Sequence, residues 1–130
     1  PQVGISERFF IMSSHPNERY PYAPEMPITA IINPEILSYS EETQKGWEGC
    51  LSVPALRGNV PRHKWINVRY FTEDNDCVET EFDDFLARIF QHELDHLDGV
   101  LFTDRLDSMR DLMNEKEWYR QIIAHENKDT

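Results

Sequence analysis

The sequence lacks long apolar runs and an excess of positive charge, and each shortage excludes a class of protein. No apolar stretch is long enough to cross a membrane, and no amino-terminal signal peptide is visible. The chain carries 13 lysines and arginines against 24 aspartates and glutamates, a formal net charge of −11. Such an acidic chain is not expected to bind nucleic acid tightly by itself, because the phosphates would repel it. We therefore expect a cytoplasmic protein without a membrane anchor.

Cysteine is also scarce, with Cys50 and Cys77 the only two in 130 residues. In a secreted protein the pair could form one disulfide, whereas in a reducing cytoplasm one could be a metal ligand and the other a bystander. The lack of an export signal favours the second interpretation, with Cys77 as a half-buried bystander. A chain of this length fits one domain, residues 1–130, with enough apolar side chains for a core.

Apolar periodicity predicts several short strands in the first part of the chain. One is expected over residues 9–12, and another over 28–32, ending in a turn at Asn33-Pro34. Between them, residues 13–27 hold four of the eight prolines, so this segment is expected to be an extended surface loop. Residues 38–45 are polar and are expected to form a loop or a sheet edge.

Two alternating runs then predict a β-hairpin that leads into a helix. Residues 65–71 and 78–82 alternate between apolar and polar positions on either side of an acidic turn. The helix is expected to start with a cap at Asp83 or Asp84 and to end before Gly99, which can adopt the left-handed conformation. Because this helix is apolar over most of its surface, it is expected to be buried in the centre of the domain.

A second helix is expected near the carboxyl terminus, from Asp107 or Ser108 to about Ile123, because apolar residues recur there at helical spacing. Together these elements predict an α+β fold, with short antiparallel strands around the buried helix and a C-terminal helix. Residues 105–130 carry five basic and six acidic side chains. Strong contact between this segment and RNA is therefore not expected.

The predicted buried helix carries the pattern His92-Glu93-x-x-His96. Residues four apart leave the same face of a helix, so the two imidazoles can hold one metal ion. Glu93 stands beside them, where a carboxylate can handle the proton of a water molecule. Two histidines and a glutamate on a buried helix also need polar partners, and a metal supplies one. The pattern therefore predicts metal-assisted hydrolysis rather than two incidental histidines.

A catalytic metal site needs a third protein ligand, and the sequence offers several candidates. The metzincin pattern requires a histidine six residues after His96, but Phe102 stands there. A carboxylate from the last helix, Glu115 or Glu117, would make the site similar to that of thermolysin-like proteases. Cys50 is favoured over these, because a thiolate is a strong ligand for iron or zinc and a glycine precedes it.

Two motifs together resemble those of the peptide deformylase family. Residues 48–52 read EGCLS, and residues 91–99 read QHELDHLDG, which is similar to the family's QHExDHLxG helix. The likeness runs from Pro1 to about Leu106. It implies the function of a metal-dependent hydrolase, and it implies that the metal ligands are Cys50, His92 and His96.

The resemblance also implies roles for residues around the metal. Glu93 matches the general acid and base. The side-chain amide of Gln2 and the backbone N–H of Leu51 match the donors that steady the oxyanion. Of the family's first motif, GxGxAAxQ, only Pro1 and Gln2 remain in this sequence. The domain is therefore expected to be truncated at its amino terminus relative to the family.

The resemblance also implies which residues contact the substrate. Gly49 matches a residue whose carbonyl receives the substrate backbone. Arg57 matches a position near the substrate's outer residues, although it could be an ordinary solvated loop charge. Phe85 and Ile89 precede the histidines on the helix and could line a pocket for a methionine side chain or pack in the core. The resemblance further implies an ion pair behind the site, between Glu48 and Arg62.

The implied reaction is removal of the N-formyl group from the initiator methionine of nascent polypeptides. A thiolate ligand softens the Lewis acid, so Fe(II) is expected in the cell, with Zn, Ni or Co able to replace it in a purified sample. The implied partners are N-formylmethionyl peptides and the ribosome, in a cytoplasm, organelle or host cell with bacterial-type translation. The alternatives are an HExxH endopeptidase and an inactive homologue that binds a metal or a peptide end.

Overall fold

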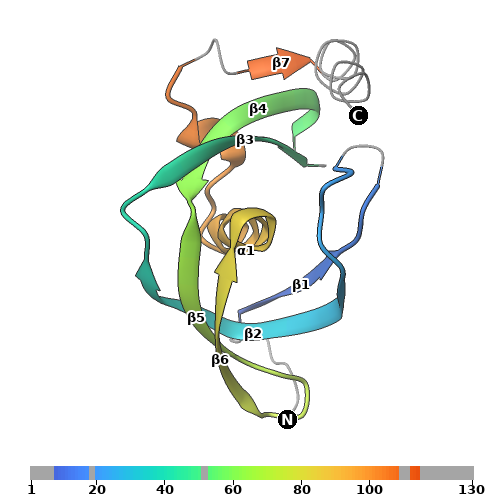
Figure 1. The fold of residues 1–130 in the computed structure, drawn as a ribbon, viewed down its shortest axis with the longest axis vertical. Helices are drawn as coiled ribbons and strands as arrows, with labels where there is room; N and C mark the ends of the chain where they lie inside the picture. The colour runs from blue at the N-terminus through green and yellow to red at the C-terminus, as the bar shows by residue number, and fades with distance from the viewer. Residues whose placement is uncertain (1–7, 18–19, 51–52, 109–111, 115–130) are drawn as a thin grey trace.

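A computed structural model describes residues 8–17, 20–50, 53–108 and 112–114, with the backbone alone for residues 50, 53–56 and 102. Two antiparallel sheets surround one helix, α1 (Asp84–Leu97), which Figure 1 views nearly end-on. The described part of the chain is therefore α+β, with short antiparallel strands about a central helix, as the sequence predicts.

The larger sheet has four strands in the order β1-β2-β5-β6. These are β1 (Phe9–Ser14), β2 (Met26–Tyr39), β5 (Trp65–Phe71) and β6 (Cys77–Asp83). Burial alternates along β5, where Ile66, Val68 and Tyr70 face the core. Phe10 of β1 meets Phe90 of α1 edge to face, with ring centroids 5.3 Å apart. The predicted first strand and the predicted hairpin of β5 and β6 are both confirmed.

The smaller sheet has the order β3-β4-β7 and lies across α1 from β1 and β2 (Figure 1). Its strands are β3 (Thr43–Cys50), β4 (Val53–His63) and β7 (Leu112–Asn114). The sequence does not predict β4, because Pro54 and Pro61 interrupt it. In the structure β7 pairs only with residues 56–58, so Pro61 lies where β7 does not reach and a missing N–H is tolerated.

Ser40 holds the corner at which the chain passes from one sheet to the other. β4 leads into β5 through Lys64 alone, and β2 leads into β3 through residues 40–42. The Ser40 hydroxyl accepts hydrogen bonds from the backbone N–H groups of Lys64 and Trp65 (2.8 and 3.2 Å). It donates one to the carbonyl of Glu42 (2.7 Å). These contacts fix the smaller sheet relative to the larger one, and therefore relative to α1.

Helix α1 begins and ends where the sequence predicts. Asp83 occupies the N-cap position, although its side chain makes no cap hydrogen bond, and Gly99 has a φ of +77° beyond the end. A single 3-10 turn, η1 (Phe102–Arg105), follows. The helix buries Phe90 in the hydrophobic core. It also buries polar side chains, namely Arg88, Gln91, His92 and Asp95.

The predicted end of the second strand is wrong. β2 does not end in a turn at Asn33-Pro34 but continues through a bulge, with a register shift between Ile32 and Glu35. Asn33 has a φ of +50°, a conformation that asparagine tolerates, and its N–H donates to the carbonyl of Arg8 (2.7 Å). Of residues 38–45, predicted to be a loop or a sheet edge, only 40–42 form a loop; residues 43–45 belong to β3 at the edge of the smaller sheet, and residues 38 and 39 extend β2.

The predicted carboxyl-terminal helix is wrong over the part that the structure describes. Residues 107 and 108 are not helical, and Leu112–Asn114 form β7. β7 pairs antiparallel with β4, with Met113 opposite Arg57. Pairing with an existing strand has overridden the helical periodicity of this short segment. The remainder of the predicted helix lies outside the described residues.

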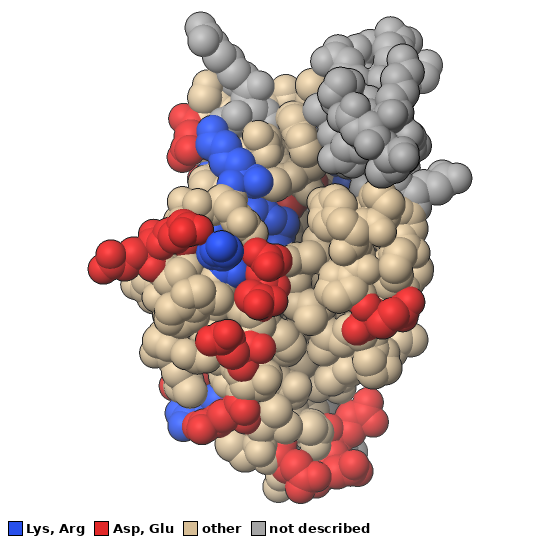
Figure 2. Space-filling model, in the orientation of Figure 1, with Lys and Arg blue, Asp and Glu red and all other residues tan. Residues whose placement is uncertain are grey.

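The described surface is rich in acidic groups. On the face drawn in Figure 2, aspartate and glutamate side chains are spread widely, whereas most of the lysines and arginines gather toward the upper left. Exposed ion pairs, such as Arg69 with Glu35 at 3.0 Å, offset only part of this charge. Within the described residues, no helix is both long and apolar enough to span a membrane.

Candidate metal centre

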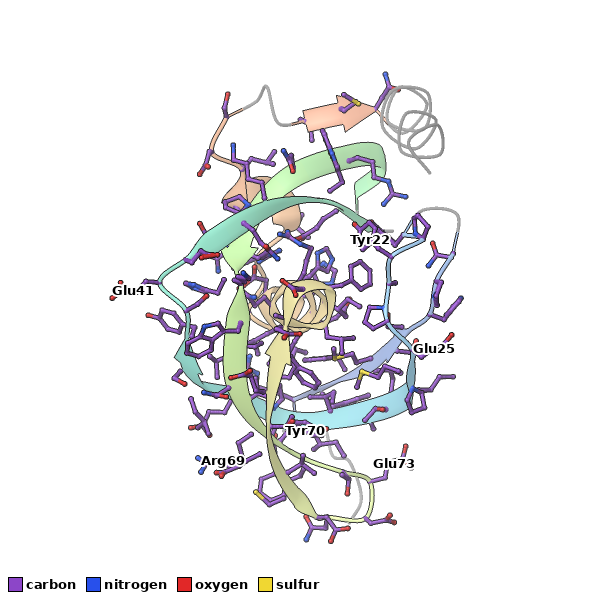
Figure 3. The ribbon with its side chains drawn as sticks, viewed as in Figure 1. Tyr22, Glu25, Glu41, Arg69, Tyr70 and Glu73 are labelled. Atoms are coloured by element: carbon purple, nitrogen blue, oxygen red, sulfur yellow. The ribbon has the colours of Figure 1, made fainter. Side chains whose placement is uncertain are left out.

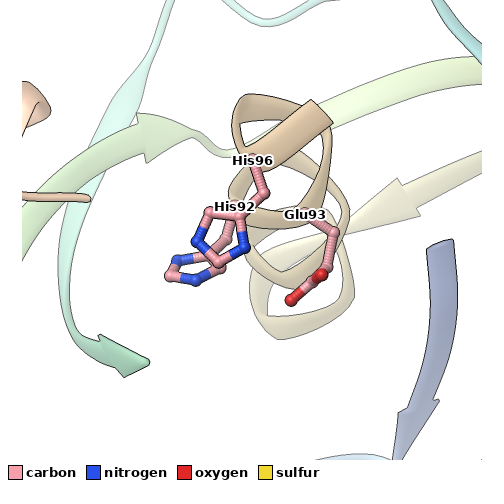
Figure 4. Close-up of side chains that lie close together, drawn as sticks. All are labelled: His92, Glu93 and His96. Atoms are coloured by element: carbon pink, nitrogen blue, oxygen red, sulfur yellow. The ribbon is translucent and has the colours of Figure 1, made fainter. Parts of the chain in front are cut away.

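Successive turns of α1 bring the histidines and the glutamate of the motif together. His92, Glu93 and His96 each offer one ligand atom, and these atoms lie within 4.8 Å of one another. The two imidazole rings are 4.5 Å apart between centroids and are inclined by 58° (Figure 4). His92 is buried, and the other two residues are half-buried. The cluster is therefore partly enclosed, with His92 the most buried of the three residues.

Glu48 of β3 sets the orientation of the His92 ring. Its Oε1 lies 2.8 Å from Nδ1 of His92, and both side chains are buried. An ionised carboxylate can only accept a hydrogen bond, so Nδ1 carries the proton. Nε2 is then the ring nitrogen that can coordinate a metal. Metal-binding histidines commonly donate their second ring N–H to a carboxylate in this way.

Two buried arginines hold the Glu48 carboxylate in its charged form. Arg62 donates to both carboxylate oxygens, from Nε at 3.0 Å and from Nη2 at 2.9 Å, and Arg88 donates from Nη1 at 2.6 Å. Burial alone would raise the pKa of Glu48, but hydrogen bonds from His92 and Arg62, with the charges of Arg62 and Arg88, lower it to about 2. Glu48 is therefore an acceptor for His92 at neutral pH.

Asp95 extends this network beyond the helix. It accepts a hydrogen bond from Nη1 of Arg62 (2.5 Å) and two from Arg105 of η1 (3.0 and 2.9 Å). Burial acts to raise the pKa of Asp95, but the hydrogen bonds from Arg105 and Arg62 outweigh it and lower the pKa below its usual value. Three arginines and two carboxylates thus form one connected group beside the histidines.

Two glycines of β3 let arginine side chains approach the backbone closely. A Cβ on Gly46 would lie 2.6 Å from Nε of Arg88, and a Cβ on Gly49 would lie 2.9 Å from Cζ of Arg57. Such separations are shorter than real Cβ contacts, so neither position accepts a side chain without a shift. Both glycines therefore allow an arginine side chain to lie directly against the backbone of β3.

The donor set around the histidines fits a metal ion. Nε2 of His96 is buried and has no hydrogen-bond partner among the described residues. A buried ring nitrogen without a partner is costly, and coordination to a cation would satisfy it. The contact with Glu48 keeps the proton of His92 on Nδ1, so that Nε2 is the atom that can coordinate a metal. With the carboxylate of Glu93, these groups form a site of the kind that binds divalent metals.

The residues expected to contact the substrate lie in different surroundings. Arg57 is buried in β4, so the alternative of a solvated loop charge is wrong. Gly49 is half-buried in β3 and packs against Arg57. Ile89 is partly buried against the hydrophobic core. Phe85 instead packs against two aromatic rings of the loop between β1 and β2, those of Tyr20 and Tyr22.

Several predicted site residues lie outside the described part of the chain. These are Gln2, Leu51, Glu115 and Glu117. The backbone of Cys50 is described, and it ends β3 two residues after Glu48. Cys77 is exposed in β6, which corrects the expectation that it is half-buried.

Sequence reasoning missed most of the network behind the histidines. The expected pair of Glu48 with Arg62 is present, but the contacts of Glu48 with His92 and Arg88 were not expected. A signal existed, because Arg88 and Asp95 are two turns apart on a helix that is otherwise largely apolar. Polar side chains on a buried helix face need partners, and β3 supplies one of them.

Comparison with known proteins points to one family. The family model for polypeptide deformylases matches residues 1–111. Peptide deformylase 2 of a Nostoc species is 52% identical over 128 residues, which cover 98% of this chain and 71% of that protein. Peptide deformylase 1 of Prochlorococcus marinus is 50% identical over 107 residues, which cover 82% of this chain and 56% of that protein.

Solved structures agree with this chain in fold. The class I type b peptide deformylase of Acinetobacter baumannii, bound to Met-Ala-Ser, has a TM-score of 0.74 at 52% identity and covers 76% of this chain. The peptide deformylase of Thermotoga maritima has a TM-score of 0.67 at 43% identity and covers 82%. This chain spans 62% and 66% of the lengths of those two proteins.

Proposed function

Because this chain belongs to the peptide deformylase family, we propose that it removes the N-formyl group from the initiator methionine of nascent polypeptides. The family is metal-dependent. The observation that carries the proposal is the cluster of His92, Glu93 and His96 on α1, with Glu48 accepting a hydrogen bond from His92. A carboxylate beside two oriented imidazoles is what metal-assisted hydrolysis requires.

The metal would be held by His92, His96 and the thiolate of Cys50. Cys50 is supported by its place at the end of β3, two residues after the Glu48 that contacts His92. A divalent cation there supplies a Lewis acid that lowers the pKa of a coordinated water toward neutrality. A thiolate reduces the effective charge of the cation, so we propose Fe(II) in the cell, with Zn, Ni or Co as substitutes in a purified sample.

Glu93 is proposed to move the proton of the reaction. It takes a proton from the attacking water as the water oxygen bonds to the formyl carbon. It then gives that proton to the nitrogen as the C–N bond breaks, which leaves formate and a free amino terminus. The side-chain amide of Gln2 and the N–H of Leu51 are proposed to donate hydrogen bonds to the oxyanion.

The substrate is proposed to lie between β3 and α1. The carbonyl of Gly49 would accept a hydrogen bond from the substrate backbone, with Arg57 near the outer residues. Phe85 and Ile89 would wall a pocket for the methionine side chain, because they precede Glu93 on one side of the helix. The relative from A. baumannii was solved with Met-Ala-Ser bound, a peptide that begins with methionine.

Formylated peptides are products of bacterial-type translation, so we propose that the protein acts in a cytoplasm, organelle or host cell where such translation occurs. Its proposed partners are N-formylmethionyl peptides as they leave the ribosome. The formal charge of −11 argues against tight binding to ribosomal RNA.

Formate release from formyl-Met-Ala-Ser by the iron-loaded protein, kept free of oxygen, tests the proposal. We expect turnover by the wild-type chain and a loss of about 10²- to 10⁴-fold in Glu93→Gln at unchanged metal content. Glu81→Gln, the same change on an exposed position of β6, is the matched control and should leave turnover unchanged. Wild-type turnover in Glu93→Gln, or none in the loaded wild-type protein, would contradict the proposal.

Replacing Cys50 by alanine separates the alternatives. If Cys50 is the third ligand, Cys50→Ala loses both metal and formate release. An endopeptidase that used Glu115 or Glu117 would instead keep its metal and cleave internal peptide bonds. An inactive homologue would bind metal or a peptide end in the wild-type form and release no formate.

A further inference from the structure

A tyrosine of the loop between β1 and β2 joins the strand and the helix that would enclose the substrate. Tyr20 donates a hydrogen bond from Oη to the carbonyl of Trp47 in β3 (3.2 Å). Its ring lies 5.0 Å from that of Phe85, in the first turn of α1, between centroids. Tyr20 is half-buried, so it is part of the packed structure at both ends of its side chain.

The loop fixes Tyr20 through backbone hydrogen bonds as well. The N–H of Tyr20 donates to Oδ1 of Asn17 (3.0 Å), and the carbonyl of Tyr20 accepts from the N–H of Ala23 (3.1 Å). Ala23 is itself buried. Tyr22, which Figure 3 labels, adds a second ring against Phe85, at 5.7 Å and nearly perpendicular, while its own side chain is largely exposed. The aromatic group around Phe85 is therefore built by this loop.

Phe85 lies on the side of α1 that leads to Glu93. Phe85, Ile89 and Glu93 are spaced by four residues, so they follow one another along the helix, about 12 Å from first to last. The hydroxyl of Tyr20 contacts Trp47, which directly precedes Glu48 and Gly49 in the sequence. Tyr20 thus connects the far wall of the proposed methionine pocket to the strand that would receive the substrate backbone.

We propose that Tyr20 is a positioning residue that fixes Phe85 and thereby sets the preference for a long apolar first side chain in the substrate. This inference rests on the proposed function. The hydroxyl contact with Trp47 sets the separation of β3 from the loop, and the ring contact sets the rotation of Phe85. A peptide whose first residue is short does not reach this wall, so its binding does not depend on Tyr20.

Two substitutions separate the hydroxyl from the ring. Tyr20→Phe loses the hydrogen bond to Trp47 and keeps the ring against Phe85, whereas Tyr20→Ala loses both. We measure kcat and KM for formyl-Met-Ala-Ser and formyl-Ala-Ala-Ser. The ratio of their kcat/KM values should fall about tenfold in Tyr20→Ala, through a higher KM for the methionine peptide, and two- to threefold in Tyr20→Phe.

Tyr39→Phe is the matched control, because Tyr39 is exposed at the end of β2 and stacks on His63 instead. It should leave the ratio unchanged. A purely structural role for Tyr20 would lower kcat/KM for both peptides by the same factor, and that result would overturn the inference. So would an unchanged ratio in both variants. If Tyr20→Ala fails to fold, the ratio of the two kcat/KM values in Tyr20→Phe tests the inference by itself.

Measurements of peptide binding test the inference independently of catalytic turnover. Calorimetry on the metal-loaded protein compares Met-Ala-Ser with Ala-Ala-Ser, neither of which can be deformylated. A binding preference for Met-Ala-Ser that falls in both Tyr20 variants supports the inference. It does so even if the wild-type protein releases no formate, a result that would contradict the proposed function but not the inference. Equal binding of the two peptides by the wild-type protein, or no binding of either, would overturn the inference.

Discussion

Glu48 is the residue on which the geometry of the candidate site depends. One buried carboxylate accepts hydrogen bonds from His92, Arg62 and Arg88, and so links β3, β4 and α1. Each partner gains from the others, because the arginines keep the carboxylate ionised and the carboxylate orients the imidazole. Removal of the carboxylate would leave two buried guanidinium groups without their common partner.

Glu48→Ala is therefore expected to destabilise the metal-free protein by about 3–5 kcal/mol, the usual cost of breaking a buried ion pair. Urea unfolding of the metal-free protein measures this without a contribution from the cation. Glu35→Ala, which removes a carboxylate from the exposed pair with Arg69, is the control and should leave the unfolding midpoint where it was. Equal losses of unfolding free energy in the two variants would show that the buried ion pair contributes no more stability than the exposed one.

Glu48→Gln addresses the orientation of His92 rather than stability. The amide keeps the size of the side chain but accepts a weaker hydrogen bond from the ring. We expect metal affinity to fall about 10- to 100-fold, as for other partners of metal-binding histidines. Competition against a chelator of known affinity measures it, and an unchanged dissociation constant would mean that Glu48 does not orient a ligand.

At the scale of elements, the packing of β3 on α1 depends on the absence of a side chain at Gly46. The Arg88 guanidinium next to it cannot move aside freely, because it donates to Glu48 and to the carbonyls of Gln44 and Val60. The strand and the helix are therefore held together by polar contacts at a point where the helix would otherwise need apolar neighbours.

Gly46→Ala is expected to cost about 1–3 kcal/mol, because the added methyl group forces Arg88 away from its partners. Gly99→Ala is the comparison, since Gly99 has open space around it and only its positive φ resists substitution. That strain costs about 1–2 kcal/mol. Thermal unfolding measures the loss of stability in both variants. Only Gly46→Ala should also weaken metal binding. Equal metal affinities in the two variants would contradict this account.

The elements that the sequence predicts are those with clear periodicity. α1 and the hairpin of β5 and β6 follow from apolar spacing and turn residues, and both are confirmed. β4 and β7 are not predicted, because prolines interrupt the first and a helical pattern covers the second. Their strand conformation comes from pairing with β3 and with each other, which no local pattern records.

At the scale of the whole molecule, two sheets meet around one helix, and the candidate site lies where that helix faces the smaller sheet. The sequence predicts His92, Glu93 and His96 as a group, because they share one helix. It does not predict the contact of Arg62 with Asp95, because these two residues come from different elements. Such contacts depend on how the sheets are joined at Ser40, which is a property of the tertiary fold.

Metal binding is expected to stabilise the whole fold, because the proposed ligands, Cys50 of β3 with His92 and His96 of α1, come from separate elements. At a free metal concentration about 100 times the dissociation constant, the free energy of unfolding should rise by about 2.7 kcal/mol. Thermal unfolding with and without a chelator measures the difference. His96→Ala should unfold at the same temperature in both conditions, and a metal-dependent shift that survives in that variant would place the cation elsewhere.

X-ray absorption at the metal edge of the zinc-loaded protein tests the central claim most directly, namely that Cys50, His92 and His96 hold one ion. The account predicts one sulfur neighbour at about 2.3 Å and two imidazole nitrogens at about 2.0–2.1 Å. The sulfur contribution should disappear in Cys50→Ser. A spectrum of the wild-type protein with nitrogen and oxygen neighbours only would contradict the account.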